Sequence, residues 1–430
     1  MRVTYVTAGA AGMICGSCLR DNNLAHELRA LQCDVILVPV YTPIRTDVEN
    51  ASDDHLLFGG VSVYLEQRSR IFRKLPRSLT SWLDRPGFIN RLTAKNSIKI
   101  DAGQLGELTL SMLRGEHGNQ RNEVTRCVAW MKEKARPDLV NLSNLLIAGF
   151  VPALKRELNV PVLVTLQGDD LFLEELTDQH RPEVLAELRR LAREVDGFIT
   201  FSESYAQSMA ELLEIPREKF HIVTIGIDSR DFSGLKRISG RPPTVGYFGR
   251  IAPEKGFARI VDAFIHLHSE HNLGKACLKA AGWLGENNRE FFETQVGRIE
   301  AAGLGQNFNY TGAPGRQGKL EFFSSIDAFS LPTTCREPKG LPVLEALASG
   351  IPVVQPEHGI FPEMLSKTGG GILIAPGDSK VLAASLAKLL ENPGKAEQLG
   401  EEGRTGVIGK CTGRHMANET LNIYRQFLES

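Results

Sequence analysis

The sequence predicts an α/β protein made of two Rossmann-like, doubly wound domains that face a central cleft. Three observations predict this fold class. Short apolar runs recur between longer helical stretches, the alternation continues along nearly the whole chain, and it breaks once near the middle. Apolar runs of this kind are typical of strands buried on both faces, as in parallel sheets. Because open α/β sheets bind ligands at the carboxyl ends of their strands, we expect a site in the cleft.

The predicted strands are short runs of apolar and β-branched residues. In the first half they are 2–7, 34–40, 60–65, 139–143, 160–166, 198–202 and 221–225. In the second half they are 244–248, 276–281, 308–311, 328–332, 351–355 and 372–375. Helical periodicity is evident between them in 183–195 and 379–391, and a last helix is expected at about 414–428. This alternation predicts a doubly wound sheet in each half.

A single break in the alternation places the domain boundary. Residues 228–243 gather Gly, Ser, Pro and charged residues without periodicity, as linkers do. We therefore expect an N-terminal domain over 1–228, a linker over 229–243 and a C-terminal domain over 244–413. The last helix, within about 414–430, is expected to pack back on the first domain.

The composition limits the class of protein and its location. Of 430 residues 42% are hydrophobic, and 50 Lys and Arg balance 51 Asp and Glu. This balance gives no sign of a nucleic-acid partner. Seven cysteines, an odd number, argue against a complete disulfide framework and for a reducing cytoplasm. The first apolar run is short for a signal peptide and no run reaches the roughly 18–20 apolar residues of a membrane span, so a soluble cytoplasmic protein is expected.

Two glutamates, Glu337 and Glu345, lie in the stretch C-R-E-P-K-G-L-P-V-L-E-A-L-A-S-G. On one continuous helix they would point about 80° apart and lie about 12 Å apart along the axis, a poor geometry for an acid/base pair. Pro342 excludes that helix, because proline fits best at the first helical position and biases Leu341 away from helical angles. We therefore expect Glu337 on a loop after a strand and Glu345 one turn inside a helix that Gly350 ends.

The start of that helix is a candidate anion site. The free amides near Gly340 and Leu341 would face out of the helix N-terminus, and Gly340 would let a ligand come close to the backbone. The alternative is a strand, a loop and a helix that carry two solvated glutamates. This stretch alone is compatible with both interpretations.

A second candidate stretch is G-Y-F-G-R-I-A-P-E-K-G (246–256), directly after the first strand of the second domain. Arg250 and Lys255 would lie at the carboxyl end of that strand. Two cations there suit a diphosphate, since arginine binds phosphate bidentately and lysine acts as a compact charge. Ordinary surface cations are the alternative for this stretch.

The order of the motifs is more specific than any one of them. The two stretches above are accompanied by A-A-G-W-L-G (280–285), N-Y-T-G-A (309–313), G-I-F-P-E-M (359–364) and G-G-G-I-L-I-A-P-G-D (369–378). This ordered set resembles the retaining GT-B glycosyltransferases of family 4, the glycosyl transferases group 1, over nearly all of the second domain. The first domain resembles the family more loosely, through its Gly-rich first loop, F-S-E-S (201–204) and G-I-D (226–228).

The resemblance implies a GT-B fold and a transferase that moves a sugar from a UDP-, GDP- or ADP-sugar with retention of anomeric configuration. It implies no metal and no other cofactor. Arg250 and Lys255 would hold the donor diphosphate, and Glu345 would bond the ribose. Glu337, with the helix amides named above, would contact the donor sugar and the pyrophosphate. Cations and amides aimed at the departing diphosphate would stabilise its charge without a metal.

Gln167 departs from the family pattern. The family often carries a histidine near the reacting sugar, after the strand that matches V-L-V-T-L, where this sequence has T-L-Q-G-D-D. Glutamine hydrogen-bonds a hydroxyl or a carbonyl but does not exchange protons. Gln167 is therefore a candidate catalytic residue that could act by hydrogen bonding. Asp169 or Asp170 is an alternative polar group near the acceptor, and surface or helix-capping roles are the other interpretation of these two.

The first loop, T-A-G-A-A-G-M-I-C-G-S-C-L-R-D-N, follows the first strand. Gly12 and Gly16 would let the backbone approach a donor phosphate or the acceptor. Cys15 and Cys18 form a C-x-x-C motif. The sequence has no second C-x-x-C or Cys/His pair that could complete a metal site with it. We therefore expect small residues at a helix start there, in preference to a metal or redox site.

The stretch 68–95 is strongly basic, with eight Lys and Arg against one acid, Asp84, and with apolar side chains interleaved. One interpretation is peripheral contact with an anionic membrane, where the stretch would receive a lipid-linked acceptor. The other is a solvated insertion over the acceptor cleft. The acceptor is expected to be a carbohydrate or a lipid-linked molecule.

Sugar transfer is the leading functional hypothesis. Another enzyme of the same fold, such as an epimerase or a phosphorylase, is an alternative. A pseudoenzyme that binds nucleotide sugars is a further alternative, prompted by the glutamine at position 167.

Overall fold

The structure is a computed structural model of the chain. It describes residues 1–9, 16–44, 46–53, 67, 102–232, 234–271 and 273–429. The chain divides into two compact units, of which the first comprises Met1–Val223 and Met416–Ser430 and the second comprises Thr224–His415. The boundaries expected from the sequence lie at residue 228 and at about residue 414.

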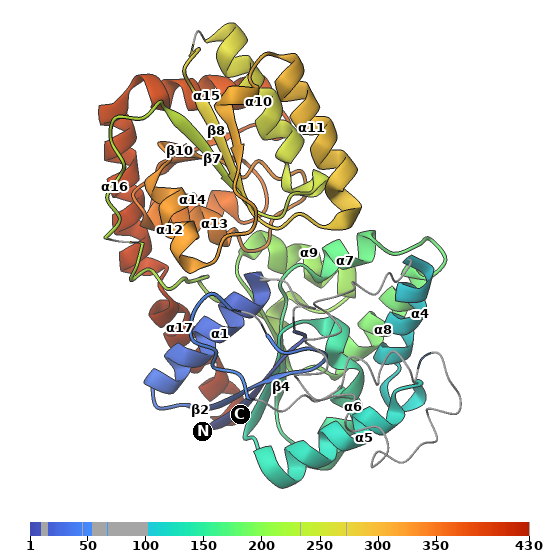
Figure 1. The fold of residues 1–430 in the computed structure, drawn as a ribbon. Coiled ribbons are helices and arrows are strands. Elements are labelled where there is room, and N and C mark those ends of the chain that lie inside the picture. Colours follow the sequence, from blue (N-terminus) through green and yellow to red (C-terminus); the bar gives the residue numbers. More distant parts are fainter. Residues whose placement is uncertain are drawn as a thin grey trace. The chain divides into compact units, whose positions relative to one another are not determined.

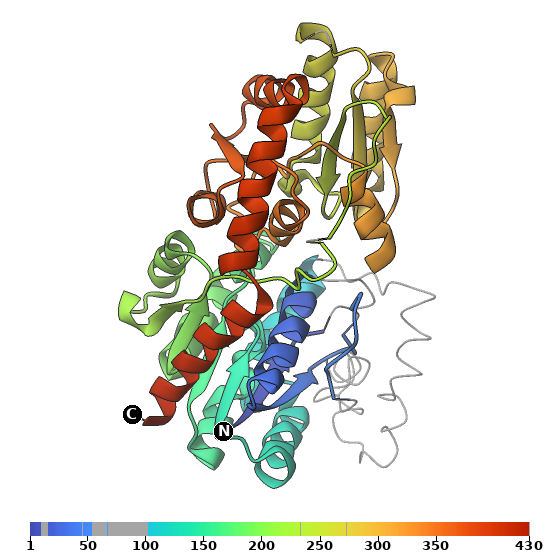
Figure 2. The same ribbon diagram turned by 90° about the vertical axis from the view of Figure 1, so that its left-hand side faces the viewer.

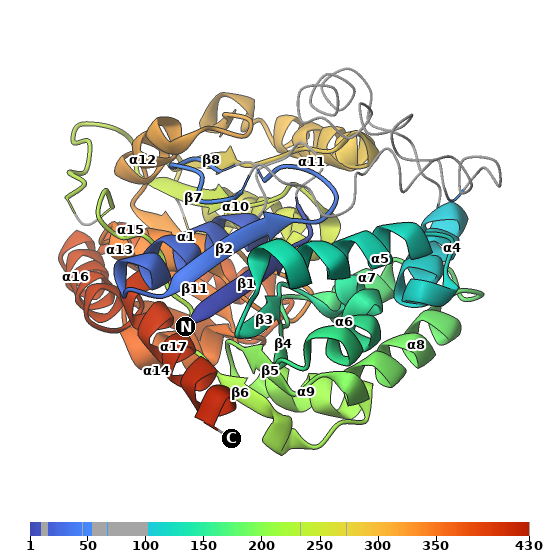
Figure 3. The same ribbon diagram turned by 90° about the horizontal axis from the view of Figure 1, so that it is seen from below.

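The first unit is built on a parallel sheet with the strand order β2-β1-β3-β4-β5-β6. Its strands are β1 (Arg2–Thr7), β2 (Asp34–Pro39), β3 (Leu139–Leu142), β4 (Val162–Thr165), β5 (Gly197–Thr200) and β6 (Phe220–Ile222) (Figure 3). The helices are α1 (Gly16–Ala30), α4 (Ala102–Leu113), α5 (Arg121–Trp130), α6 (Val151–Leu158), α7 (Asp169–Glu174), α8 (Arg181–Glu194), α9 (Glu203–Leu213) and α17 (Gly413–Glu429). The direction of strand addition reverses at β1, which is where such sheets bind ligands.

Residues of the β1 strand pack into two separate hydrophobic cores, one on each face of the sheet. Val3 belongs to a core that it shares with Leu24 of α1 and with Met416 and Tyr424 of α17. Val6 belongs to the other core, to which α4, α5, α6, α8 and α9 contribute. Because successive strand residues point to opposite faces, α1 and α17 cover one face of the sheet together (Figures 1 and 2).

The second unit repeats the plan with the strand order β12-β11-β10-β7-β8-β9, again with parallel pairing throughout. Its strands are β7 (Thr244–Phe248), β8 (Cys277–Ala281), β9 (Phe308–Tyr310), β10 (Ala328–Phe329), β11 (Val353–Pro356) and β12 (Gly371–Ile374). The helices are α10 (Phe257–Glu270), α11 (Arg289–Ala301), α12 (Arg316–Ser324), α13 (Leu341–Ala348), α14 (Phe361–Thr368), α15 (Ser379–Glu391) and α16 (Pro393–Lys410). The switch point lies between β7 and β10, so the loops that follow these two strands leave the sheet side by side.

The helices of the second unit are sorted onto the two faces of its sheet by the direction of each crossover. The β7–α10–β8 crossover runs one way along the sheet and the β10–α13–β11 crossover runs the other way. Since such crossovers are right-handed, α10 and α13 lie on opposite faces. Helix α15 packs against α10, whereas α16 packs against α13 and α14. The α10/α15 face and the α13 face are therefore distinct surfaces of one sheet.

The predicted fold class is confirmed, and the differences from the predicted strands are local. The expected strand 328–332 is paired only over Ala328–Phe329, because the chain then leaves the sheet as a loop. The expected strand 351–355 begins at Val353, after Pro352, which has no N–H to donate to a ladder. The expected strand 60–65 lies outside the described residues. No helix in the described part of the chain is long and apolar enough to cross a membrane.

Candidate functional site

Two adjoining loops form the centre of the candidate site, one after β7 and one after β10. They are joined by a backbone hydrogen bond in which Thr334 N donates to Glu254 O at 2.9 Å. The first loop is also braced by the fully buried Tyr247, whose hydroxyl donates to Arg250 O at 3.0 Å. Burial raises the pKa of Tyr247 well above its usual value, so the hydroxyl stays protonated as a donor.

Gly256 permits the close contact between these loops. Its φ is +76°, and a Cβ built on it would lie 1.8 Å from Pro332 O. An L-residue is disfavoured at this φ, and here its side chain would also collide with backbone. The loop that carries Arg250 and Lys255 therefore keeps its course only with glycine at this position.

Gly256→Ala is expected to destabilise the protein by about 2–4 kcal/mol, because it combines backbone strain with a steric clash. Gly297→Ala is the control, since Gly297 lies in α11 and a Cβ added there would have nothing within 4 Å. That control is expected to be neutral or slightly stabilising. Urea unfolding of both variants measures the difference, and equal midpoints would show that the contact between the loops is unimportant.

Lys255 and Glu337 form a buried ion pair between the two loops. The Lys255 Nζ to Glu337 Oε2 distance is 2.6 Å, and the side chains are 17% and 8% exposed. The other oxygen, Glu337 Oε1, accepts from Lys339 N and Gly340 N, each at 3.3 Å. Burial by itself would raise the pKa of Glu337, but the Lys255 ammonium and these neighbours lower it to about 2. Glu337 is therefore ionised at any physiological pH and has no proton to give.

The ion pair predicts a defined loss of stability in acid. The pKa of Glu337 is about 2 in the folded protein and near 4.5 when unperturbed, so its contribution is complete above about pH 4.5. It is lost as the pH falls from 4.5 towards 2, and it amounts to about 3 kcal/mol. We expect the difference in unfolding free energy between wild type and Glu337→Gln to be larger at pH 7 than at pH 3. A difference that does not change with pH would contradict the depressed pKa.

Arg250 lies in the same loop as Lys255 but faces a different carboxylate. Its guanidinium forms an ion pair with Glu254, four residues on, and the two side chains are 37% and 34% exposed. The two predicted cations thus each have a carboxylate partner in this structure. Both side chains of this pair are half-buried and reach solvent, so the pair is weak compared with the buried pair of Lys255.

Helix α13 begins at Leu341, one residue before the expected start at Pro342. The difference is small, because the N–H groups in the first turn of a helix have no partner within the helix. Proline, which has no N–H, is therefore tolerated at the second helical position as well as at the first. Gly340 precedes the helix with φ of +63°. Its amide donates to Glu337 and does not face outwards, which corrects the expectation that this amide is free. The separation of Glu337 on a loop from Glu345 on a helix is as expected.

Glu345 is held by a lysine that the sequence did not indicate. Lys319 of α12 donates to Glu345 Oε1 at 2.9 Å, and both side chains are nearly buried. The second oxygen of Glu345 has no donor in the described part of the chain. Nothing in the sequence around Lys319 marks it, because the two residues are 26 positions apart and on different helices.

The loop after β8 borders the site on its other side. Trp283 follows that strand and is 40% exposed, which is unusual for its size. Ile251 N donates to Trp283 O at 2.9 Å, so the indole-bearing loop and the Arg250 loop are joined. From the last position of β9, Tyr310 OH donates to Gly282 O in this loop at 2.7 Å.

Gln167 lies in the first unit, on the loop after β4, and is 6% exposed. Its Nε2 donates to Ser143 O at 2.8 Å and to Asp21 Oδ1 at 3.2 Å. Asp21 is fully buried in α1, where it also forms an ion pair with Arg20 at 2.5 Å. The structure therefore gives Gln167 a structural hydrogen-bonding role that the sequence did not predict.

Asp169 and Asp170 are also engaged within the first unit. Asp169 Oδ1 accepts from Leu145 N at 2.6 Å, and Asp170 Oδ1 accepts from Tyr205 OH at 2.8 Å. Both residues lie in the first turn of α7, where carboxylates favour the helix N-terminus. These contacts favour the helix-terminal interpretation over a role at the acceptor.

The remaining predicted residues are only partly described. Gly16 begins α1, and Cys18 is buried in the same helix. Gly12, Cys15 and the basic stretch 68–95 lie outside the described residues. Among the described residues, no group of three or more His, Cys, Asp and Glu side chains is placed to hold a metal ion.

Residues 229–406 match the family glycosyl transferases group 1, and residues 110–231 match glycosyltransferase family 4. Among curated relatives, an MMP alpha-(1->4)-mannosyltransferase of Mycolicibacterium hassiacum is 24% identical over 240 residues, 55% of this chain and 56% of that protein. A glycogen synthase of Mycobacterium tuberculosis is 26% identical over 302 residues, 67% of this chain and 69% of that protein. The match thus spans little more than half of the mannosyltransferase.

Solved structures resemble the chain over its whole length. Sucrose-phosphate synthase from Thermosynechococcus elongatus superposes with a TM-score of 0.70 at 17% identity and with full coverage of both chains. Anabaena HepE in complex with UDP and glucose gives 0.69 at 16% identity, covering 99% of this chain and 100% of that one. At these identities the likeness establishes the fold and leaves the ligands of this chain to be argued from its own residues.

Proposed function

The chain belongs to the group 1, family 4 glycosyltransferases of GT-B fold, and on this basis we propose that it transfers a sugar from a nucleoside-diphosphate sugar to an acceptor. We further propose that transfer retains the anomeric configuration and needs no metal. The observation that carries the proposal is the switch point of the second unit. There the loops after β7 and β10 bring Arg250, Lys255 and Glu337 together beside the start of α13.

Lys255 is proposed to bind the donor diphosphate without leaving its place. An ammonium has three donors, and among the described residues only Glu337 accepts from Lys255. Two donors remain for phosphate oxygens while Glu337 keeps the side chain oriented. Burial opposes the charge of Lys255, yet Glu337 outweighs it and raises the pKa of the lysine. The cation is therefore permanent and preorganised, as stabilisation of a leaving diphosphate requires.

Arg250 is proposed to exchange partners when the donor binds. Its pair with Glu254 is only half-buried and still reaches solvent, so it contributes about 0–1 kcal/mol. A diphosphate offers more negative charge and accepts the guanidinium bidentately. The electron pair of the breaking C1–O bond would end on the diphosphate, and we propose that Arg250, Lys255 and the Leu341 amide stabilise the charge that develops there.

Glu337 and Glu345 are proposed to position the donor at its two ends. Since Glu337 stays ionised, its part is to accept hydrogen bonds and to hold Lys255, and not to transfer protons. Lys319 fixes Glu345 through Oε1, which leaves Oε2 to accept from ribose hydroxyls. The exposed Trp283 offers a face on which the base can stack.

The acceptor is proposed to be a carbohydrate or a lipid-linked molecule, and the names of the curated relatives support a carbohydrate.

A donor panel tests the proposal. UDP-, GDP- and ADP-glucose are screened by thermal shift, and the stabilising donor is followed by NMR in EDTA through transfer or slow hydrolysis. A first-formed product with the anomeric configuration of the donor supports the proposal. An inverted product contradicts retention, and a requirement for added metal contradicts metal independence.

The same panel separates the alternative functions. An epimerised sugar or dependence on inorganic phosphate would favour another enzyme of this fold. Donor binding without transfer or hydrolysis would favour a binding protein. No binding of any nucleotide at about millimolar concentration would contradict the donor site itself.

A further inference from the structure

The loop after β11 lies against the loop that carries Glu337. We call its residues 358–360, which lead from the strand into α14, the supporting loop. The residue before it is anchored to the sheet, because Glu357 N donates to Ile374 O, at the end of β12, at 2.8 Å. The edge of the sheet therefore sets the position of the supporting loop.

The supporting loop holds the main chain of Glu337. Ile360 N donates to Glu337 O at 2.9 Å. Gly359, with φ of +59°, lies so close that a Cβ built on it would be 2.6 Å from both Glu337 N and Glu337 O. The side chain of Glu337 is held separately, by Lys255 and by two amides at the start of α13. The position of the carboxylate therefore depends on the course of its own main chain as well as on Lys255.

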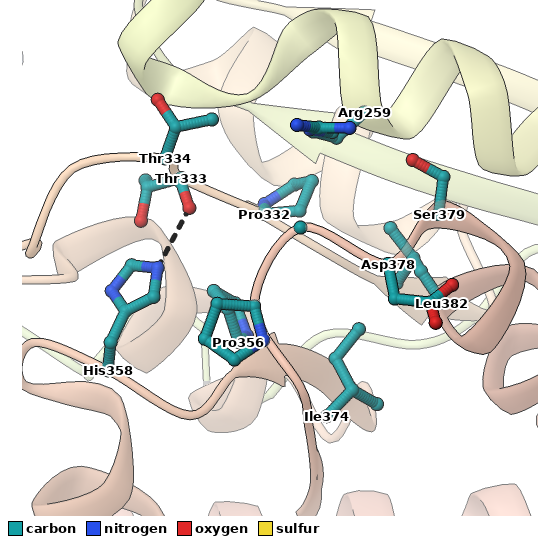
Figure 4. A pocket seen from close by; sticks show the side chains of 12 residues that line it. Arg259, Pro332, Thr333, Thr334, Pro356, His358, Ile374, Asp378, Ser379 and Leu382 are labelled. Atoms are coloured by element: carbon teal, nitrogen blue, oxygen red, sulfur yellow. Dashed lines mark hydrogen bonds between the residues drawn. The ribbon is translucent and has the colours of Figure 1, made fainter.

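His358 holds the same loop at an earlier residue. His358 Nε2 lies 2.9 Å from Thr333 O (Figure 4). A carbonyl oxygen only accepts, so Nε2 carries the proton and donates it to this bond. Burial lowers the pKa of His358, which keeps the ring neutral at neutral pH. The contact is therefore a hydrogen bond from a neutral, half-buried histidine to the backbone of the Glu337 loop.

A second pocket explains why the loop depends on this bond. It lies on the α10/α15 face, apart from the residues assigned to the donor, and residues 332–334 are part of its lining (Figure 4). Residues that border a pocket have no packed side chains on that side. Hydrogen bonds must therefore fix the course of this segment. The bond from His358 to Thr333 O and the bond from Thr334 N to Glu254 O both do so.

The segment that His358 holds leads directly to the candidate donor site. Thr333 and Glu337 belong to one loop, and Glu254, which accepts from Thr334 N, is the neighbour of Lys255. Both members of the buried ion pair thus depend on the course of this segment. If Thr333 O were released, we would expect the loop to move and the 2.6 Å contact between Lys255 and Glu337 to lengthen. Small misplacements of such groups weaken electrostatic stabilisation strongly.

We propose that His358 is a positioning residue of the donor site: its hydrogen bond to Thr333 O holds the loop that places the Glu337 carboxylate beside Lys255. The effect on binding of a diphosphate rests on the proposed function, because it acts through Lys255. The effect on the ion pair itself does not rest on it and is measured without any nucleotide.

Two substitutions of this histidine test the hydrogen bond. His358→Met removes the donor at similar size, whereas His358→Gln keeps an N–H group near the place of Nε2. UDP, GDP and ADP are each titrated calorimetrically. For the nucleotides that bind the wild type, His358→Met is expected to weaken binding about tenfold, and His358→Gln is expected to restore most of the affinity. In a Lys255→Met background, His358→Met is expected to change the affinity by less than about twofold, because the cation that it positions is absent.

Urea unfolding without nucleotide tests the ion pair. In the wild type, Glu337→Gln is expected to lower the unfolding midpoint. In His358→Met, the further shift caused by Glu337→Gln is expected to be about half as large or smaller, because the pair is already loosened. Should His358→Met not fold, His358→Asn takes its place, since its shorter side chain does not reach Thr333 O.

His268→Met is the matched control. His268 Nε2 lies 3.0 Å from Ala276 O, and the ring is half-buried in the same unit. Ala276 precedes β8, so this contact lies at the amino end of the strand, and the candidate site lies at the carboxyl ends of the strands. His268→Met is expected to show neither the loss of nucleotide affinity nor the coupling to Glu337.

Several outcomes would overturn the proposal. These are additive midpoint shifts for His358→Met and Glu337→Gln, equal effects of His358→Met and His268→Met, and no recovery of nucleotide affinity in His358→Gln. If the wild type binds no nucleotide, the donor site is contradicted, and the urea measurements alone decide whether His358 positions Glu337.

Discussion

Lys255→Met is expected to lower kcat/KM for sugar transfer by about 10³-fold or more. The substitution removes a preorganised cation that we place on the leaving diphosphate, and removal of one such group typically costs about 10²–10³ in rate. It also frees Glu337 from its buried partner, at 2.6 Å in the intact protein. The freed carboxylate would then repel the diphosphate, which adds to the loss. Steady-state kinetics with the stabilising donor measure the effect.

The same substitution is expected to destabilise the fold by about 3–5 kcal/mol, because it leaves a buried charge uncompensated. The double variant Lys255→Met/Glu337→Gln removes both charges and is expected to recover most of that stability. It is not expected to recover transfer. This contrast separates the two roles of Lys255, since a purely structural lysine would regain activity together with stability.

Lys388→Met is the control for this series. Lys388 is an exposed residue near the end of α15, far along the helix from its first turn. Stability and transfer are both expected to stay within the range of ordinary surface substitutions, about 0.5 kcal/mol. Full transfer activity in Lys255→Met would contradict the assignment of Lys255 to the donor.

Glu345→Gln is expected to weaken binding of the donor nucleotide by about 10–100-fold, since a charge-assisted hydrogen bond contributes about 1.5–3 kcal/mol. The effect should depend on the ribose. In the wild type, the 2′,3′-dideoxy analogue of the nucleotide is expected to bind more weakly than the nucleotide itself. In Glu345→Gln that difference is expected to shrink towards zero, because the acceptor of the ribose hydroxyls has lost its charge.

Lys319→Met is the companion variant for this prediction. It removes the side chain that fixes Glu345 Oε1 at 2.9 Å without removing the carboxylate. We expect a smaller loss of nucleotide affinity than in Glu345→Gln, with the preference for ribose retained. If Glu345→Gln instead weakens nucleotide and dideoxynucleotide equally, Glu345 does not contact the ribose.

The strands of the second unit show why the fold was predictable. Runs such as T-V-G-Y-F at 244–248 are short, apolar and β-branched, and the helical stretch 379–391 coincides with α15 to the residue. Strands buried on both faces need such runs, and the amphipathic helices that cover them need a 3.6-residue period. Both patterns are local, so they are visible in a single sequence. The strand predicted at 328–332 was too long. The observed strand ends at Phe329, where the chain leaves the sheet as the loop that carries Glu337.

The candidate site was predictable only in part. Arg250, Lys255, Glu337 and Glu345 were identified because they lie in ordered motifs, and Pro342 showed from local stereochemistry that the two glutamates are separated. Their partners were not identified. Pairing depends on which side chains meet across loops and helices, and Lys319 meets Glu345 from a helix with no motif. Gln167 shows the same limit, since its buried contact with Asp21 spans 146 residues.

The two doubly wound sheets, the family and the residue types at the ends of β7 and β10 could thus be inferred without coordinates, because periodicity, turn chemistry and motif order are properties of short stretches of chain. The folded chain was needed to show that Lys255 pairs with Glu337 and keeps it ionised, that Gly340 donates to that carboxylate, and that a second pocket lies on the α10/α15 face. Charge state and hydrogen bonding depend on burial and on neighbours distant in sequence, and these exist only once the chain has folded.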